Sequence, residues 1–125
     1  MKKIIETKNA PKAIGPYSQA ILINNTLYCS GQIAINPKTG TLINDSLKNE
    51  TFMVMQNIGE ILSAAKMNYS NIVKATIFLK DINQYNEINN IYSKFFTTNK
   101  PAREAIEVSR LPKDANIEIS VIAVK

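Results

Sequence analysis

Apolar and polar residues alternate in several short segments of this chain, as they do in half-buried strands. Residues 20–23 and 27–29 flank Asn24-Asn25-Thr26, a combination that predicts a hairpin of two strands. The last predicted strand is an apolar run interrupted only by Glu118 and Ser120. It spans residues 117–124, and two further strands are predicted over residues 72–80 and 102–108.

Two segments follow a helical period instead. Apolar residues recur from Val54 to Ala65 at the spacing of one helix face, which predicts a helix over about residues 47–67. A second helix, capped by Asp81, is predicted over about residues 82–96, because apolar side chains recur there at intervals of three and four: Tyr85, Ile88, Tyr92 and Phe95. This element order predicts an α+β fold with both helices on one face of a sheet.

Length and composition favour one compact unit. The chain has 125 residues, of which 45% are hydrophobic and 20% charged, so we expect a single domain over residues 1–125. The only cysteine, Cys29, lies in an apolar strand and is predicted to be a buried, unreactive thiol. The sequence shows no export signal and no membrane-spanning run, and we expect a cytoplasmic protein with no membrane partner.

The charged residues exclude several kinds of chemistry. The net charge of +5 comes from lysines spread between Lys2 and Lys125, which indicates a solvated surface and does not favour a nucleic-acid partner. The chain has no histidine, which excludes Ser-His-Asp and Cys-His catalysis and every zinc site that uses histidine. With lysine as the usual cation, the two arginines, Arg103 and Arg110, mark positions where a planar, bidentate donor would be required.

Two ionisable residues are candidates for a functional site. Burial of Glu118 in its apolar strand would raise its pKa and suit it to orient a water or exchange a proton; the alternative is an edge-strand carboxylate that faces solvent or a lysine. Arg103 follows Pro101-Ala102, so a rigid strand start would present a guanidinium able to clamp a carboxylate or phosphate. The alternative for Arg103 is a surface ion pair with Glu104, Glu107 or Glu118.

Weaker candidates lie near the first hairpin. Ser30 and Gly31 close a strand, where glycine allows a ligand to approach the main chain, although Ser-Gly is also ordinary turn chemistry. Tyr17 either reaches into a cleft with its hydroxyl or packs with its ring. The carboxylates have no metal-like spacing and the chain has no P-loop or dinucleotide fingerprint, so we expect no metal and no cofactor.

Five motifs carry a resemblance that extends along nearly the whole chain. They are residues 10–20 (APKAIGPYSQA), 30–33 (SGQI), 36–40 (NPKTG), 101–103 (PAR), and 110–114 (RLPKD) with 117–119 (IEI). On these motifs the chain resembles the Rid family of reactive intermediate deaminases, also called YjgF or RutC-like, and within it the 2-iminobutanoate/2-iminopropanoate deaminases. The resemblance implies a chorismate-mutase-like α+β fold with a mixed sheet, assembled as a homotrimer with ligand clefts between subunits.

The resemblance also implies an activity, the hydrolysis of enamine and imine acids such as 2-aminoacrylate and 2-iminobutanoate to 2-keto acids and ammonia. Arg103 matches the arginine that binds the substrate carboxylate, and Glu118 matches the glutamate that holds the attacking water. Four further residues match positions that line the cleft: Tyr17, Ser30, Gly31 and Asn89. Because an imine is already electrophilic, one positioned water and one recognised carboxylate suffice without histidine or metal.

The chain departs from the family pattern at three positions. Ala105 stands where many deaminases of this type have a cysteine, which excludes regulation through that thiol. Lys100 stands where an aromatic residue or proline often precedes Pro-Ala-Arg, and would alter the rim of the cleft. Lys66 replaces a frequent glycine at a helix end, at a small cost in stability.

Two alternatives stay open at this point. Some relatives are described as ribonucleases and translation inhibitors, and a basic chain can attract RNA phosphates in a salt-dependent way. A trimer that binds small carboxylates or acts as a chaperone without turnover would use the same arginine clamp.

Overall fold

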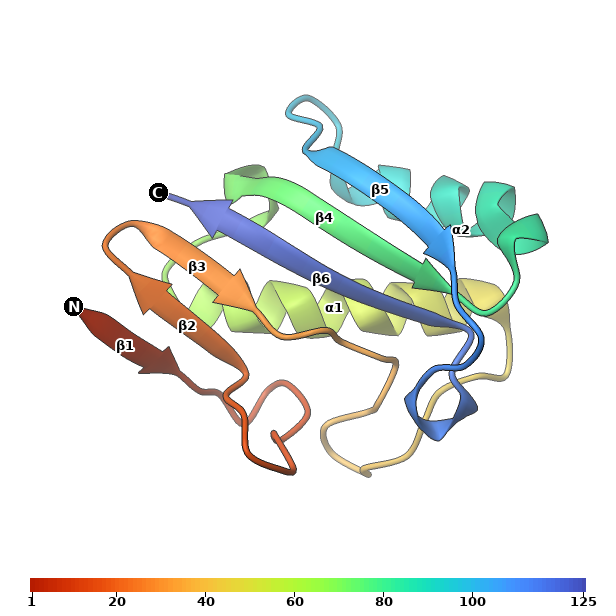
Figure 1. Cartoon of the computed structure of the whole chain (residues 1–125), viewed down its shortest axis with the longest axis horizontal. Coiled ribbons are helices and arrows are strands. Elements are labelled where there is room, and N and C mark those ends of the chain that lie inside the picture. The colour runs from red at the N-terminus through yellow and green to blue at the C-terminus, as the bar shows by residue number, and fades with distance from the viewer.

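The computed structural model describes all residues 1–125 and is built on one six-stranded sheet. The order of the strands across the sheet is β1-β2-β3-β6-β4-β5. The strands span β1 (Lys2–Ile5), β2 (Ala20–Ile23), β3 (Thr26–Cys29), β4 (Ile72–Leu79), β5 (Ala102–Glu107) and β6 (Ile117–Val124). Figure 1 looks onto these strands, with both helices behind them.

The sheet is mixed. Strands β1, β2 and β3 form an antiparallel meander, and the C-terminal strand β6 enters between β3 and β4, antiparallel to both. Only β4 and β5 run parallel, and the helical segment between them supplies the crossover that a parallel pair requires. The C-terminal strand is therefore central and carries Glu118 into the middle of the molecule.

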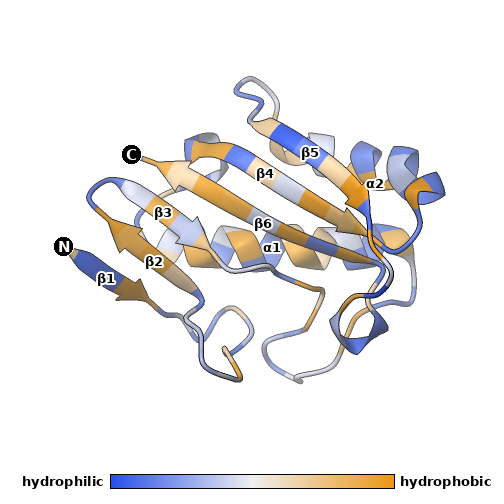
Figure 2. Cartoon of the chain, viewed as in Figure 1, coloured by the Kyte–Doolittle hydropathy of each residue, from blue (hydrophilic) through white to orange (hydrophobic).

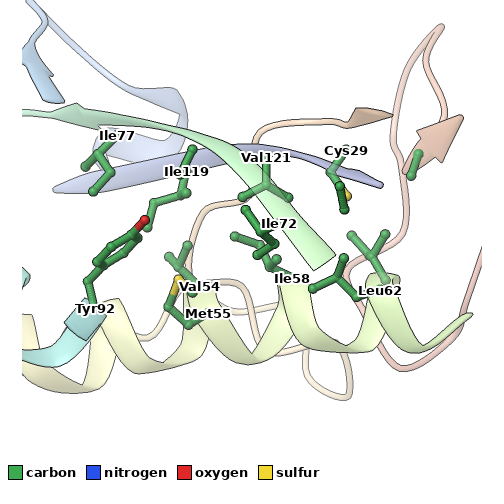
Figure 3. Packing of buried hydrophobic residues seen from close by; sticks show 14 of the residues in the cluster. Cys29, Val54, Met55, Ile58, Leu62, Ile72, Ile77, Tyr92, Ile119 and Val121 are labelled. Carbon is green, nitrogen blue, oxygen red and sulfur yellow. The ribbon is translucent and has the colours of Figure 1, made fainter. Parts of the chain in front are cut away.

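The main core lies between the sheet and α1 (Leu47–Ala64). Figure 3 shows Val54, Met55, Ile58 and Leu62 of this helix meeting side chains from the strands, among them Ile119. The helix begins at Ser46, whose Oγ accepts a hydrogen bond from the backbone N of Asn49 at 3.0 Å. The predicted α+β fold, with both helices on one face, is confirmed.

The second predicted helix is confirmed as a helical segment in three parts. It begins with a 3₁₀ turn at Ile82–Gln84, where Asp81 accepts a hydrogen bond from the backbone N of Asn83 at 2.9 Å. The regular helix α2 (Tyr85–Tyr92) follows, and Ser93–Phe95 closes the segment as another 3₁₀ turn. The predicted cap at Asp81 is therefore correct.

Strand β1 is the element that the hydropathy pattern missed. Its sequence, Lys-Lys-Ile-Ile, is too short and too polar to show an alternation, and only Ile5 is buried. The strand exists because its backbone pairs with β2 along its whole length. Such pairing depends on a neighbouring edge and leaves no mark in the side-chain pattern.

A buried carboxylate ties the start of α1 to the start of β6. Glu50 is fully buried, and its two oxygens accept hydrogen bonds from the backbone N of Asn116 at 2.8 Å and from its side-chain Nδ2 at 2.7 Å. The carbonyl of Asn116 in turn accepts from the backbone N of Lys80 at 3.0 Å. These bonds hold the residues just before Glu118 in place.

The face of the sheet turned away from the helices is uncovered and largely apolar. Figure 2 shows hydrophobic residues along the strands that face the viewer there. Register and burial place a set of exposed or half-buried apolar side chains on this face: Ile4, Ile21, Ile23, Tyr28, Phe78, Ile106, Ile122 and Val124. We call it the bare face. No helix of the chain combines the length and the apolarity needed to cross a membrane.

Helix α1 ends earlier than its apolar period predicts, in a turn centred on Lys66. The backbone N of Met67 donates to the carbonyl of Leu62 and that of Lys66 to the carbonyl of Ser63, both at 2.9 Å. This pattern requires a left-handed residue, and Lys66 has φ of 60°. A residue with a Cβ is strained at this φ, which agrees with the small cost predicted for lysine in place of glycine.

Lys66→Gly is therefore expected to raise the free energy of unfolding by about 0.5–1 kcal/mol. Urea denaturation would measure the change. Lys66→Ala serves as the control, because alanine keeps the Cβ that is strained at positive φ. An equal gain from both variants would show that the lysine side chain, and not the backbone conformation, is responsible.

Candidate functional site

Arg103 lies on the helix-covered face of the sheet, at its edge. In the parallel ladder Arg103 pairs with Ala75, which is fully buried in the core, so both side chains leave the sheet on the same side. There the half-buried guanidinium meets α2. A strand start next to Pro101 therefore delivers the arginine to a helix rather than to solvent.

Three side chains of α2 hold the guanidinium. Its Nη1 donates a hydrogen bond to Oδ1 of Asn89 at 2.7 Å, and its Nη2 donates to the hydroxyl of Tyr85. Its central carbon lies 5.4 Å from the centroid of the Tyr85 ring and 4.9 Å from that of Tyr92. The three residues are spaced i, i+4 and i+7, so a single helix face provides all of these contacts.

No carboxylate neutralises Arg103, and the alternative of a surface ion pair is wrong. Glu104 instead contacts Nζ of Lys74 at 2.9 Å and the hydroxyl of Thr76 at 2.7 Å. Glu107 accepts a hydrogen bond from the backbone N of Ile82 at 2.9 Å. A guanidinium that only neutral groups hold retains its full charge, and it is a ready site for an anion.

A cavity of about 410 Å³ opens beside the guanidinium. Its lining comes from α2, the following turn and the start of β5: Asn89, Tyr92, Ser93, Phe96, Lys100, Pro101 and Arg103. Tyr92 is buried, and its hydroxyl has no hydrogen-bond partner. Desolvation raises the pKa of Tyr92 against the opposing effect of the nearby arginine, so the phenol is a neutral donor.

Glu118 lies on the bare face, in the interior of the sheet. It pairs with Phe78 across β6 and β4, and it is half-buried with no hydrogen bond or ion pair. Desolvation raises the pKa of this carboxyl above its ordinary value. Because β6 is an interior strand and Glu118 has no lysine partner, the alternative of an edge-strand carboxylate that faces solvent or a lysine is wrong, and the expected rise in pKa is confirmed.

Gly31 provides the space that the Glu118 side chain occupies. A Cβ added at Gly31 would lie 2.8 Å from the carboxyl carbon of Glu118, which is closer than van der Waals contact allows. Beside it, Ser30 is anchored through its hydroxyl, which donates to the carbonyl of Ser18 at 2.6 Å. Ser30, Gly31 and Glu118 thus form one group on the bare side of the sheet.

The remaining candidates have no contact with Arg103 or Glu118 among the hydrogen bonds and ion pairs of the chain. Tyr17 is exposed and lines a separate cavity of about 810 Å³ between β1 and the segment before β2. Arg110 is exposed, with its Nε 4.0 Å from a carboxylate oxygen of Asp114. Cys29 is buried, and desolvation raises its pKa to about 12, which confirms the prediction of an unreactive thiol.

A single chain therefore does not bring Arg103 and Glu118 together. Side chains of adjacent residues in a strand leave opposite faces of the sheet. Arg103 pairs with Ala75 of β4 and Glu118 with Phe78 of the same strand, an odd number of residues apart, so the two side chains lie on opposite faces. Arg103 with Asn89 faces the helices, whereas Glu118 with Gly31 lies on the bare face. The candidate residues therefore form two separate groups, one on each face of the sheet.

Sequence reasoning missed two residues at the arginine. Tyr85 and Tyr92 were assigned to the apolar stripe of the second helix, yet their rings and the Tyr85 hydroxyl contact Arg103. The available signal was the position of Asn89 on the same helix face, four residues after Tyr85 and three before Tyr92. A polar amide flanked by two tyrosines at helical spacing is typical of a face that contacts a polar group.

The chain is thus a small α+β domain with a group of candidate residues on each face of its sheet. The family model described as Endoribonuclease L-PSP matches residues 7–125. The chain is 45% identical to human 2-iminobutanoate/2-iminopropanoate deaminase, an alignment that covers 100% of this chain and 91% of the human protein. The chain belongs to the Rid family, also known as the YjgF or L-PSP family.

Solved structures agree with this assignment. A Rid family protein of unknown function from Yersinia pestis superposes with a TM-score of 0.97 at 51% identity and covers 100% of both chains. The TdcF protein of E. coli, solved with bound serine, has a TM-score of 0.94 at 38% identity and covers 98% of each chain. The resemblance noted from the sequence motifs is confirmed.

Glu118→Gln is expected to stabilise the protein at neutral pH. Because desolvation raises the pKa of the folded-state carboxyl, folding is penalised wherever the unfolded chain carries an ionised glutamate, above its ordinary pKa of about 4.3. The penalty vanishes below that pKa, where both states are protonated. The gain in Tm should therefore be larger at about pH 7 than at about pH 3.5. Exposed Glu6→Gln controls for net charge, and an equal pH-dependent gain from it would contradict the argument.

Proposed function

We propose that this protein hydrolyses the reactive imines of small 2-amino acids, such as 2-iminobutanoate and 2-iminopropanoate, to 2-keto acids and ammonia. The observation that carries the proposal is the guanidinium of Arg103, which is held by neutral groups beside an open cavity and lacks a carboxylate partner. The name of the human relative supports the reaction. The serine bound to the E. coli relative supports recognition of an amino-acid-sized carboxylate.

In the proposed mechanism Arg103 binds the substrate carboxylate with two parallel hydrogen bonds and places the imine carbon near a water. Glu118 accepts a proton from that water as its oxygen adds to the C=N carbon. The carboxyl returns this proton to the nitrogen, which gives a carbinolamine. The carboxylate then takes the hydroxyl proton and passes it to the amine, so that the C=O bond forms, the C–N bond breaks and ammonia leaves. A raised pKa suits Glu118 to both proton transfers, because it strengthens the carboxylate as a base and brings its protonated form closer to the pH at which the enzyme works.

The proposed site requires more than one chain. Because Arg103 and Glu118 face opposite sides of their own sheet, a cleft that holds both must combine the arginine of one chain with the glutamate of another. We propose a homotrimer that buries the bare face, whose apolar side chains are otherwise left in water. A closed ring of three copies makes one such cleft at each interface.

A second candidate function is RNA cleavage. It is favoured by the description of the matching family model, and the net charge of +5 permits contact with RNA phosphates. Its binding would weaken steeply with salt and would not require the Arg103 clamp. A third reading, carboxylate binding without turnover, predicts ligand affinity but no release of keto acid.

The decisive experiment generates 2-iminobutanoate in situ with an amino-acid oxidase and catalase and follows the release of free 2-oxobutanoate and ammonia. Arg103→Ala should lower kcat/KM by about 100-fold or more, because charge-assisted hydrogen bonds to the carboxylate are lost. Glu118→Gln should lower kcat by about 100-fold or more through the loss of its proton transfers. Turnover that is unchanged in either variant would contradict the role given to that residue.

Mixing these two variants tests whether the site is shared between chains. When inactive Arg103→Ala and Glu118→Gln chains are refolded together in equal amounts, about one interface in four would carry both native residues, so about a quarter of wild-type activity should return. Each variant refolded alone is the control. No recovery in mixtures that have exchanged subunits, as measured with a mass tag, would show that the site lies within one chain.

Gly31→Ala tests the space that Glu118 occupies. The added Cβ would displace the carboxylate, so we expect a fall in kcat of about tenfold or more with little change in KM, because Arg103 and the carboxylate clamp are untouched. Circular dichroism and light scattering would confirm that fold and assembly are retained. A rise in KM with kcat unchanged would contradict this prediction.

A further inference from the structure

The cavity beside Arg103 contains a second cation that the proposed reaction does not use. Lys100 lines the same space, three residues before the arginine, in the segment that joins the 3₁₀ turn after α2 to Pro101. We propose that this cavity selects imines of acidic amino acids, with Arg103 on the carboxylate next to the imine and Lys100 on the distal carboxylate. The inference rests on the proposed deaminase function and names its substrate class.

The charges of the cavity support a ligand with two negative groups. None of its lining residues is acidic, and neither Lys100 nor Arg103 forms a salt bridge within the chain. Two lysines in and just after β4 behave differently: Lys74 pairs with Glu104 and Lys80 with Asp114, each at 2.9 Å. Two unpaired cations that share one concave surface attract a dianion more strongly than a monoanion.

The polar groups of the cavity point to the same chemistry. The hydroxyl of Tyr92 is buried without a partner, and desolvation keeps it protonated, so it is an unused donor at the cavity wall. A carboxylate is an acceptor with no donor of its own, which matches a site lined by donors. An aliphatic substrate side chain would leave this hydroxyl without a partner and would make no contact with the exposed Lys100 ammonium.

The size of the cavity also agrees with this assignment. A volume of about 410 Å³ lies within the range of small-molecule sites and leaves room for a second carboxylate. Lys100 carries its charge on a flexible four-carbon stem, which allows it to reach acids of different length, whereas Arg103 is fixed by α2. Lys100 thus selects the substrate and takes no part in the hydrolysis, which adds water across C=N and releases ammonia as before.

The test compares two imines made in situ, 2-iminosuccinate from an aspartate oxidase and 2-iminobutanoate from a general amino-acid oxidase, each with catalase. Lys100→Gln should lower kcat/KM for the dicarboxylate imine by about tenfold, which corresponds to about 1.4 kcal/mol, and leave the monocarboxylate imine within about twofold. Lys100→Arg should retain the preference. Lys48→Gln on the exposed surface of α1 removes the same charge outside the cavity and should change neither value.

A binding measurement separates this inference from the proposed function. In calorimetry with stable keto acids, 2-oxoglutarate should bind wild type more tightly than 2-oxobutanoate does, and Lys100→Gln should reduce that difference. If wild type hydrolyses neither imine, the proposed function fails. If it hydrolyses 2-iminobutanoate while Lys100→Gln weakens both substrates and both keto acids equally, or neither, the function stands and the role of Lys100 is overturned.

Discussion

The contact of Arg103 with α2 is the interaction on which the candidate site depends. A half-buried guanidinium would ordinarily be neutralised by a carboxylate, yet two tyrosine rings, one hydroxyl and one amide oxygen hold this one. Ring faces offset part of the cost of desolvating the cation, by about 1–2 kcal/mol, without cancelling its charge. The nearby acids are engaged elsewhere, Glu104 by Lys74 and Glu107 by a backbone N–H. The guanidinium therefore has no acidic partner within the chain, and its geometry suits an anion from outside the chain.

The alternation of side chains in the sheet divides the chemistry of the chain between its two faces. The face that carries Arg103 is covered by helices and holds a cation without a carboxylate partner, whereas the bare face carries Glu118, an unpartnered carboxylate with a raised pKa. Both residues are poorly compensated in the isolated chain. Such local costs are typical of functional sites, where stability is given up for chemistry. The bare face is also poorly compensated, because its apolar side chains face water in the isolated chain. A second copy of the chain is the simplest partner for it.

The scaffold that places Glu118 depends on a contact between residues far apart in the sequence. The buried carboxylate of Glu50, in the first turn of α1, accepts both donors of Asn116, which is 66 residues later in the chain. Neither residue has a feature in the sequence that marks it as one half of a pair. The same holds for Tyr85, whose apolar spacing assigned it to the core although its hydroxyl contacts Arg103. Contacts of this kind follow from the packing of whole elements and leave no periodic signal.

The sequence by itself determined the elements, the family and the identity of the two ionisable residues. Periods of two and of 3.6 residues record which side of a strand or helix is buried, and both helices and all but the first strand followed from them. The absence of histidine had already excluded imidazole chemistry, the scarcity of arginine singled out Arg103 and Arg110, and the family resemblance implied a carboxylate clamp and a glutamate that holds water. Only the tertiary structure decided that Arg103 has no acidic partner and that Glu118 lies in the middle of the sheet, on the opposite face. The insertion of β6 between β3 and β4 sets that arrangement, and strand order depends on long-range pairing that local patterns do not encode.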